Sequence, residues 1–313
     1  MPHPRRFRFG IQLSSTGSAA EWAELAREAE DLGYSTLFVP DHFGDQLAPA
    51  PALAAAATAT TGLRIGTLVL DNDYRHPVVT AKEMATLDVL SEGRLELGLG
   101  AGWMASDYDQ SGIPMDEAAV RIDRLEEGLT VLRGLFAPGA FDFAGKHYAI
   151  AGLDGTPKPV QDPHPPLLIG GGGPRVLRLA AREADIVGIN PAIRSGRVDG
   201  AAARDGAAEV TDRKLAWVRE AAGDRYPGLE INMLIFVCAV TDDRAGTLEA
   251  TAPLFGMTPD QVAEYPHAWV GSAEEIAADL EAGRERWDAS YLVVQGVEAM
   301  RAAAPVVARL AGT

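Results

Sequence analysis

The chain has little cysteine, little basic charge and no long apolar run. A single cysteine, Cys238, allows no internal disulfide and no thiolate zinc cluster, which fits a reducing compartment. No segment offers the roughly 18 uninterrupted apolar residues that a membrane helix needs. The 28 lysines and arginines are outnumbered by 44 acidic residues, and the net charge of −16 opposes nonspecific attraction to nucleic acid or an anionic bilayer. We therefore expect a cytoplasmic protein that binds a small molecule, with no nucleic acid and no membrane as partner.

The length and the apolar content indicate a folded globular protein. With 313 residues, 47% of them hydrophobic, the chain can bury a large core without disulfides or metals. This excludes a mini-protein and a largely disordered chain. No low-complexity linker divides the sequence, so we expect one domain over residues 1–313.

Short apolar runs alternate with amphipathic, alanine-rich stretches. The runs are near-continuous apolar blocks, as expected for parallel strands covered on both faces. They cover residues 8–13, 35–39, 64–70, 94–99, 166–170, 185–189, 230–238 and 290–295. Helical patterns cover residues 19–32, 50–60, 77–90, 116–136, 174–183, 206–223, 243–253, 273–286 and 299–310. Eight β-then-α units predict a single (β/α)8 barrel of the α/β class, with an open doubly wound sheet as the rival.

Start signals support this segmentation independently of the periodicity. Ser18 with Glu21 and Ser272 with Glu275 have the spacing of a capping box. Two stretches interrupt the alternation, at residues 137–165 and 241–270; the first reads as a hairpin with a proline-rich connector, and the second has a short helix of its own. Barrel enzymes place such variable loops at the C-terminal face, so we expect both insertions there, where they could form a lid.

Two glycine-rich turns follow predicted strands. Gly100, Ala101 and Gly102 end one strand ahead of Trp103, and glycines there let a flat ligand approach the backbone, although a tight turn without a ligand has the same pattern. The spacing is not that of a dinucleotide-binding fold. The residues Gly170, Gly171, Gly172 and Gly173 lead from another strand into a helix, which favours a phosphate site over a plain turn. Arg175 is either a charge partner for that phosphate or a surface residue.

Asp41 and His42 directly follow the second predicted strand. A histidine at the catalytic end of a barrel strand can move a proton, and the alternative is a loop cap with an exposed histidine. The other histidines show no spacing for a metal site, and Cys238 lies in an apolar strand pattern rather than at a nucleophile position. We therefore expect no metal and no covalent catalysis. Trp103 is expected to line the pocket.

These segments, in this order, resemble one family over about residues 8–310. They read FGIQLS, LFVPDHF, RHPVVTAKEMATLDVLSEGRLELGLGAGW and PPLLIGGGGPRVLRLAAREADIVGIN. Together they are similar to the luciferase-like flavin and deazaflavin oxidoreductases, and most similar to the branch that uses coenzyme F420. The resemblance implies a (β/α)8 barrel with an isoalloxazine-like ring at its C-terminal mouth, and often a homodimer through barrel helices.

The resemblance also implies roles for particular residues. Asp41 would contact the polar edge of the ring, and His42 would donate a proton or orient the substrate. A bulge with a non-proline cis peptide would support the ring at Leu68–Val69. The turn from Gly100 to Trp103 would border the ring, while the run from Gly170 to Gly173 would bind the phosphate and Asn190 the tail beyond the ring.

The implied reaction is hydride transfer between F420 and a small organic substrate. An FMN-dependent monooxygenase that uses reduced flavin and oxygen is the first alternative, and a non-catalytic flavin-binding or deazaflavin-binding protein is the second. The F420-dependent sugar-phosphate dehydrogenases carry a glutamate where this chain has Trp103, which counts against a sugar phosphate and favours a larger, less polar substrate. A basic group in the sixth loop and helix either meets the anionic tail of F420 or is solvated; it comprises Arg194, Arg197, Arg204, Arg213 and Lys214.

Overall fold

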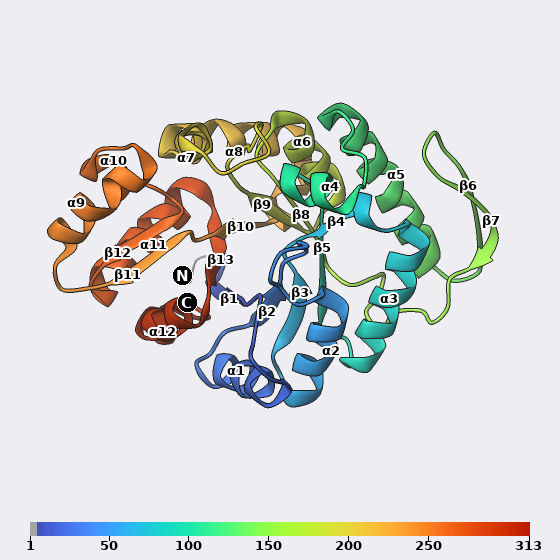
Figure 1. Cartoon of the computed structure of the whole chain (residues 1–313), viewed down its shortest axis with the longest axis horizontal. Helices are drawn as coiled ribbons and strands as arrows, with labels where there is room; N and C mark the ends of the chain where they lie inside the picture. The colour runs from blue at the N-terminus through green and yellow to red at the C-terminus, as the bar shows by residue number, and fades with distance from the viewer. Residues whose placement is uncertain (1–4) are drawn as a thin grey trace.

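Eight parallel strands close into the barrel that the sequence pattern predicts (Figure 1). The structure is a computed structural model that describes residues 5–313. The strands are β1 (Arg8–Gln12), β2 (Thr36–Val39), β3 (Arg64–Thr67), β5 (Leu95–Gly100), β8 (Leu167–Gly171), β9 (Ile186–Ile189), β10 (Glu230–Leu234) and β13 (Ala289–Gln295). Strand β3 pairs with β2 on one side and with β5 on the other, which closes the ring. The (β/α)8 prediction is confirmed and the open doubly wound sheet is excluded.

The predicted helices surround the barrel. They are α1 (Ala19–Asp31), α2 (Pro49–Ala59), α3 (Pro77–Leu90), α5 (Ala118–Phe136), α6 (Pro174–Glu183), α8 (Ala208–Ala222), α9 (Arg244–Phe255), α11 (Ala273–Trp287) and α12 (Val297–Leu310). Ser272 and Glu275 form the full capping box that their spacing predicts, whereas Ser18 accepts from the Glu21 N–H while the Glu21 carboxylate turns to Thr16 and Gly17 instead. In residues 5–313 no helix is long and apolar enough to cross a membrane.

Two short helices were not predicted. α4 (Ala105–Ser111) follows the glycine turn after β5, where the sequence shows no helix start. It has no side-chain cap and is only seven residues long, so neither capping nor periodicity marks it. α7 (Gly200–Asp205) is similarly short, although Asp199 caps it. The remaining turns are the 3-10 helices η1 (Asn72–Tyr74) and η2 (Gly223–Gly228).

Two predicted strands are broken at their C-terminal ends. Residues 64–70 form β3 and then β4 (Leu70–Asp71), separated by a cis peptide at Leu68–Val69, as the family resemblance implies. The single strand expected at 230–238 is wrong: β10 ends at Leu234, and β11 (Val237–Val240) pairs with β12 (Ala268–Gly271) outside the barrel. The cause is a change of partner, because the Phe236 N–H donates to the His267 carbonyl rather than to a barrel strand.

The two insertions lie at different places. The second, with α9, α10 (Pro259–Ala263) and the β11–β12 pair, follows β10 and so starts from the C-terminal face as predicted. The first contains the predicted hairpin, β6 (Ala140–Ala144) and β7 (Ala149–Asp154), but it connects the end of α5 to the start of β8. It packs along the outside of α5 (Figure 1), where Glu127 accepts the N–H groups of residues 146–148. Its expected position at the C-terminal face, as a lid, is therefore wrong.

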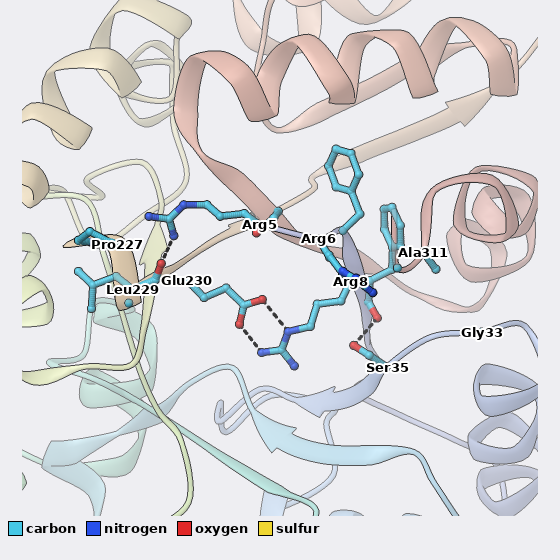
Figure 2. Close-up of a pocket in the computed structure, with 14 residues that line it drawn as sticks. Arg5, Arg6, Arg8, Gly33, Ser35, Pro227, Leu229, Glu230 and Ala311 are labelled. Atoms are coloured by element: carbon cyan, nitrogen blue, oxygen red, sulfur yellow. Dashed lines mark hydrogen bonds and ion pairs between the residues drawn. The ribbon is translucent and has the colours of Figure 1, made fainter. Parts of the chain in front are cut away.

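The N-terminal end of the barrel is closed by ion pairs. Arg8 and Arg64 both donate to Glu96 Oε1, at 2.5 and 2.7 Å, and Tyr291 donates to Glu96 Oε2 at 2.8 Å. Burial alone would raise the pKa of Glu96, but the two guanidinium groups outweigh it and hold that pKa below its usual range. Arg8 also binds Glu230 bidentately beside a cavity of about 630 Å³ at this end (Figure 2).

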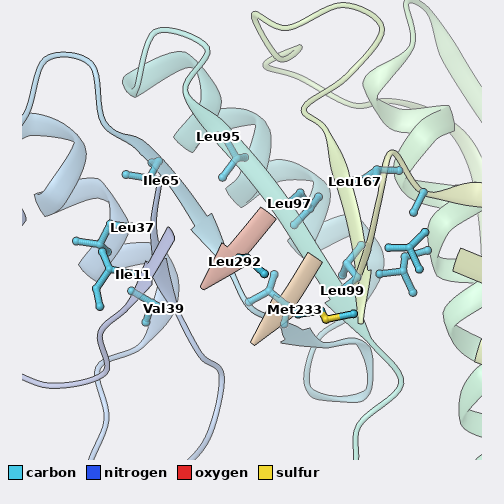
Figure 3. Packing of buried hydrophobic residues seen from close by; sticks show 14 of the residues in the cluster. Ile11, Leu37, Val39, Ile65, Leu95, Leu97, Leu99, Leu167, Met233 and Leu292 are labelled. Carbon is cyan, nitrogen blue, oxygen red and sulfur yellow. The ribbon is translucent and has the colours of Figure 1, made fainter. Parts of the chain in front are cut away.

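Apolar side chains fill both sides of the sheet. Those facing the helices form the main core (Figure 3), with Leu37, Leu97 and Met233 among its fully buried members. The inside of the barrel holds a second cluster that includes Phe38 and Tyr291. Burying one such side chain contributes about 1.5–3 kcal/mol, so this packing fixes the strands whose C-terminal ends carry the predicted site.

Candidate active site

The structure brings the predicted site residues to one side of the barrel mouth. They follow the C-terminal ends of five strands that are neighbours in the sheet: Asp41 and His42 after β2, Val69 between β3 and β4, Gly102 after β5, Gly172 after β8 and Asn190 after β9. Parallel strands place all these ends at the same edge. Residues spread over 150 positions of sequence thus gather at one half of the mouth.

Val69 and two glycines form a flat platform at the mouth. A Cβ on Gly100 would lie 2.8 Å from Val69 Cγ2, and one on Gly170 would lie 3.5 Å from Val69 Cγ1. The Val69 side chain therefore lies against the bare backbone of β5 and β8. Gln12 anchors the cis-peptide segment at Leu68–Val69, since its Nε2 donates to the Leu68 carbonyl at 2.7 Å. Val69 and the two glycines therefore lie next to one another at the mouth, with no side chain on the glycines between them.

The glycine run after β8 ends at an open helix terminus. Gly173 is the N-cap residue of α6, no side chain caps that helix, and a Cβ on Gly173 would meet no atom within 4 Å. Backbone N–H groups at such a terminus bind anions. Arg175 does not contribute, because it bonds the Ala119 carbonyl and Asp123 on the exposed side of α5. Of its two predicted positions, the surface one is confirmed.

Asn190 has an unsatisfied polar atom at the mouth. Its Oδ1 is buried without a hydrogen-bond partner, a state that costs about 1–3 kcal/mol until a donor arrives. The Asn190 carbonyl is occupied by Lys214 Nζ at 2.8 Å. Lys214 is 1% exposed and also binds Asp205, so it positions this loop and cannot meet an anionic tail. The other members of the predicted basic group are exposed: Arg194, Arg197, Arg204 and Arg213.

Asp41 is engaged by protein groups. Arg75 Nη1 and Nη2 donate to its two oxygens at 2.5 and 2.9 Å, and the Asp71 N–H donates to Oδ2 at 3.0 Å. This ties the loop after β2 to the segment after β4. Nothing in the sequence pattern singled out Arg75, since its spacing from Asp41 depends on the barrel.

His42 pairs with a carboxylate at the mouth. Its Nδ1 lies 2.7 Å from Asp107 Oδ2, and Tyr74 Oη donates to the same oxygen at 3.1 Å. The Trp103 ring meets the His42 ring edge to face, with centroids 5.6 Å apart. Trp103 thus packs against His42, and its role as a pocket wall stays a prediction. Asp107 was missed because it lies on the unpredicted helix α4.

A buried carboxyl lies behind this pair. Asp71 accepts from Tyr108 Oη at 2.9 Å and from the Asp73 N–H at 2.9 Å. Burial raises the pKa of Asp71 to about 6, and the charges of Asp73 and Asp41 act in the same direction. A side chain at Gly102, which has φ +74°, would run into Asp71 and Tyr108.

Other chemistries find little support in the structure. Among residues 5–313 no group of three or more histidine, cysteine or acidic side chains is placed to hold a metal. Cys238 is half-buried, and burial raises the pKa of its thiol to about 12, so it is a poor nucleophile. The groups gathered at the mouth are Val69 with its neighbouring glycines, the uncapped N-terminus of α6 and the His42–Asp107 pair.

Comparison with known proteins identifies the family of the chain. Residues 6–306 match the family model described as luciferase-like monooxygenase. The chain belongs to this family. Its luciferase-like barrel superimposes with a TM-score of 0.79 on the F420-dependent tetrahydromethanopterin reductase from Methanopyrus kandleri, at 19% identity over 97% of this chain and 99% of that one.

Two further comparisons show what the chain is similar to. An F420-dependent glucose-6-phosphate dehydrogenase of Microbacterium testaceum is 33% identical over 187 residues, which is 57% of this chain and 55% of the relative. A monooxygenase from Streptomyces bottropensis superimposes with a TM-score of 0.75, at 24% identity over 96% of this chain and 99% of that one. The luciferase-like chain described here is accordingly an oxidoreductase, whose relatives include deazaflavin enzymes and monooxygenases.

Proposed function

We propose that this protein transfers a hydride between coenzyme F420 and a small organic substrate at the C-terminal mouth of its barrel. The observation that carries the proposal is the pairing of His42 with Asp107 beside the Val69 platform. A hydride transfer to or from a C–O or C–N bond needs a partner that takes or gives a proton, and a held histidine supplies it.

The residues present fit a phosphate-bearing ring cofactor. Val69 with Gly100 and Gly170 provides a surface for the ring, and the uncapped terminus at Gly173 provides N–H donors for a phosphate. The orphaned Asn190 Oδ1 requires a donor, such as a hydroxyl of the chain between ring and phosphate. Bound F420 would supply the two-electron step at the central carbon of its ring.

The chain's own residues position the reactants and move the proton. Gln12 and the platform hold the ring face, while Arg75 and Asp41 fix the loop that presents His42. His42 holds or releases the proton at its imidazole, close to Trp103. Trp103 brings an apolar wall where a charged group would favour a sugar phosphate, so we infer a less polar substrate. Such preorganisation accounts for much of an enzyme's rate advantage.

The proposal is tested by titrating purified cofactor-free protein with F420 and, separately, with FMN, each followed by ring fluorescence. Micromolar or tighter F420 binding with at least tenfold weaker FMN binding is the expected result. It directs a substrate screen toward ketones, alcohols, imines and electrophilic alkenes. Tighter FMN binding would overturn the F420 assignment and make the oxygen-using monooxygenase the function to test.

Homodimerisation and a cytoplasmic location remain predictions that accompany this proposal. Sedimentation of the purified chain at micromolar concentration tests the first. A monomer would contradict the dimer prediction, and the F420 titration is read independently of it.

A further inference from the structure

Asp107 lies in a protected position beside the proposed proton carrier. It is 5% exposed and belongs to the first turn of α4, the short helix that follows the glycine turn after β5. Its Oδ2 atom is shared by His42 Nδ1 at 2.7 Å and Tyr74 Oη at 3.1 Å. The three side chains come from the loops after β2, β4 and β5, so only the closed barrel brings them together.

The chemistry of these groups fixes the direction of both hydrogen bonds. An ionised carboxylate only accepts hydrogen bonds, and the Tyr74 hydroxyl must donate to it. The proton of a neutral His42 therefore resides on Nδ1, which leaves Nε2 as the lone-pair nitrogen. Without Asp107 a neutral imidazole is free to place its proton on either nitrogen.

We propose that Asp107 is a positioning residue that selects the Nδ1–H tautomer of His42 and thereby makes Nε2 the atom that exchanges the proton with the substrate. This inference rests on the proposed oxidoreductase function for the role of His42. In the oxidation of an alcohol, the C–H hydride leaves for the cofactor ring while the O–H proton moves to Nε2, and the C–O bond becomes C=O. In the reverse direction the imidazolium returns that proton to the carbonyl oxygen.

Contacts around Asp107 support both the helix that carries it and the tyrosine that donates to it. The Ala105 N–H at the start of α4 donates to the Gly196 carbonyl at 3.1 Å, which joins this helix to the loop after β9. A Cβ on Gly196 would press on Ala105 at 2.7 Å, so the two backbones are in close contact. On the other side, Phe43 packs on Tyr74 with ring centroids 4.6 Å apart. These contacts fix the start of α4 and support the Tyr74 ring beside the shared carboxylate oxygen.

The direct test is nitrogen NMR of the histidine rings in the ligand-free full-length protein. Spectra are recorded at a pH well above the ordinary titration range of histidine, where ring tautomers are resolved, and the His42 signals are assigned with His42→Gln. Wild type is expected to show the Nδ1–H form, and Asp107→Ala a mixture or the Nε2–H form. Asp109→Asn is the matched control, because Asp109 is exposed on the same helix. An unchanged His42 tautomer in Asp107→Ala overturns the proposal.

Kinetics provide a second readout that a merely structural role would not reproduce. Asp107→Ala is expected to lower kcat at least about tenfold with F420 affinity unchanged within about twofold. Adding Asp107→Ala to His42→Ala should cause no further loss, since Asp107 acts through His42. Additive losses in the double variant would overturn the assignment. The NMR result does not depend on F420, so failure of the proposed function and failure of this inference are distinguishable.

Discussion

The two ends of the barrel differ in how their buried polar side chains are paired. At the N-terminal end, Glu96 is 1% exposed and shared by Arg8 and Arg64, so its charge is balanced within the protein. At the C-terminal end, Asn190 has a buried oxygen with no partner, and Asp71 is a buried carboxyl without an arginine among its hydrogen-bond donors. The charge of Glu96 is thus paired within the protein, whereas Asn190 Oδ1 is left without a partner.

The paired groups at one end of the strands serve stability, and we expect the unpaired groups at the other end to serve ligand binding. Groups that complete one another's hydrogen bonds contribute to folding, because breaking the set leaves an uncompensated charge. Groups left incomplete cost free energy in the empty protein and recover it when a ligand supplies the missing partner. A cavity of about 630 Å³ lies at the N-terminal end, so a cavity of this size does not by itself mark the active site.

The largest expected effect is on stability, and it comes from removing the buried carboxylate at the N-terminal end. Glu96→Gln leaves Arg8 and Arg64 without their shared carboxylate, and we expect the free energy of unfolding to fall by about 3–5 kcal/mol. Urea denaturation measures it. Glu230→Gln is the matched control, since that side chain is 26% exposed and its loss should cost less than half as much.

The same pair of variants tests whether the two ends are independent. Folded Glu96→Gln protein should bind F420 with wild-type affinity, since no residue of the mouth contacts Glu96. A variant as stable as wild type, or one that is stable but no longer binds F420, would contradict the division between the ends.

At the C-terminal end, His42→Ala should lower kcat by about 1,000-fold with little change in F420 affinity. The reason is that the histidine moves a proton and does not belong to the platform around Val69. Steady-state kinetics and a fluorescence titration of the same preparation separate the two quantities. Loss of F420 affinity with unchanged kcat would contradict the proton-transfer role and make His42 a cofactor-binding residue.

Much of the fold could be predicted from local patterns. The strands read as apolar blocks and most helices carry periodicity or caps, so all eight barrel strands and nine helices are found at nearly their predicted bounds. The exceptions depend on long-range partners. β10 ends early because Phe236 bonds His267, more than 30 positions away, and the first insertion lies outside α5 because Glu127 captures its turn.

The candidate site could be predicted only in part, for a related reason. Gly100, Gly173 and His42 directly follow strands, and that position is readable from sequence. Asp107, Tyr74 and Arg75 were not identified, because their partners are 33 to 65 positions away in the chain. Arg175 and Lys214 were considered for anion binding by charge, but the structure directs both to carboxylates of the protein.

Asp71 is the buried carboxyl of the C-terminal end, as Glu96 is that of the N-terminal end. Its titration should change the free energy of unfolding with pH. Burial raises its pKa to about 6, above its value in the unfolded chain, so the folded protein retains a proton that the unfolded chain releases. Its contribution is therefore present at pH 4 and is lost as the pH rises through 6. The free energy of unfolding of Asp71→Asn, relative to that of wild type, should therefore increase by up to about 3 kcal/mol between pH 4 and pH 7.

Urea denaturation of both proteins at the two pH values measures this gain. His267, whose pKa is lowered to about 4 by burial, titrates in the opposite sense but is present in both proteins, so it cancels in the difference. Parallel pH profiles for the two proteins would show that Asp71 is already compensated, and the contrast with Glu96 would fail at this position.

The smallest expected effect examines the phosphate end of the mouth. A Cβ on Gly173 meets nothing within 4 Å and its φ is −89°, so Gly173→Ala should fold with less than about 1 kcal/mol of destabilisation. The added methyl nevertheless occupies the space through which an anion would approach the N–H groups of α6. We therefore expect F420 affinity to fall about tenfold, while the deazaflavin chromophore without its phosphate tail binds as to wild type. Equal weakening of both ligands would place the substitution's effect on the ring, and no weakening of either would move the phosphate away from this helix.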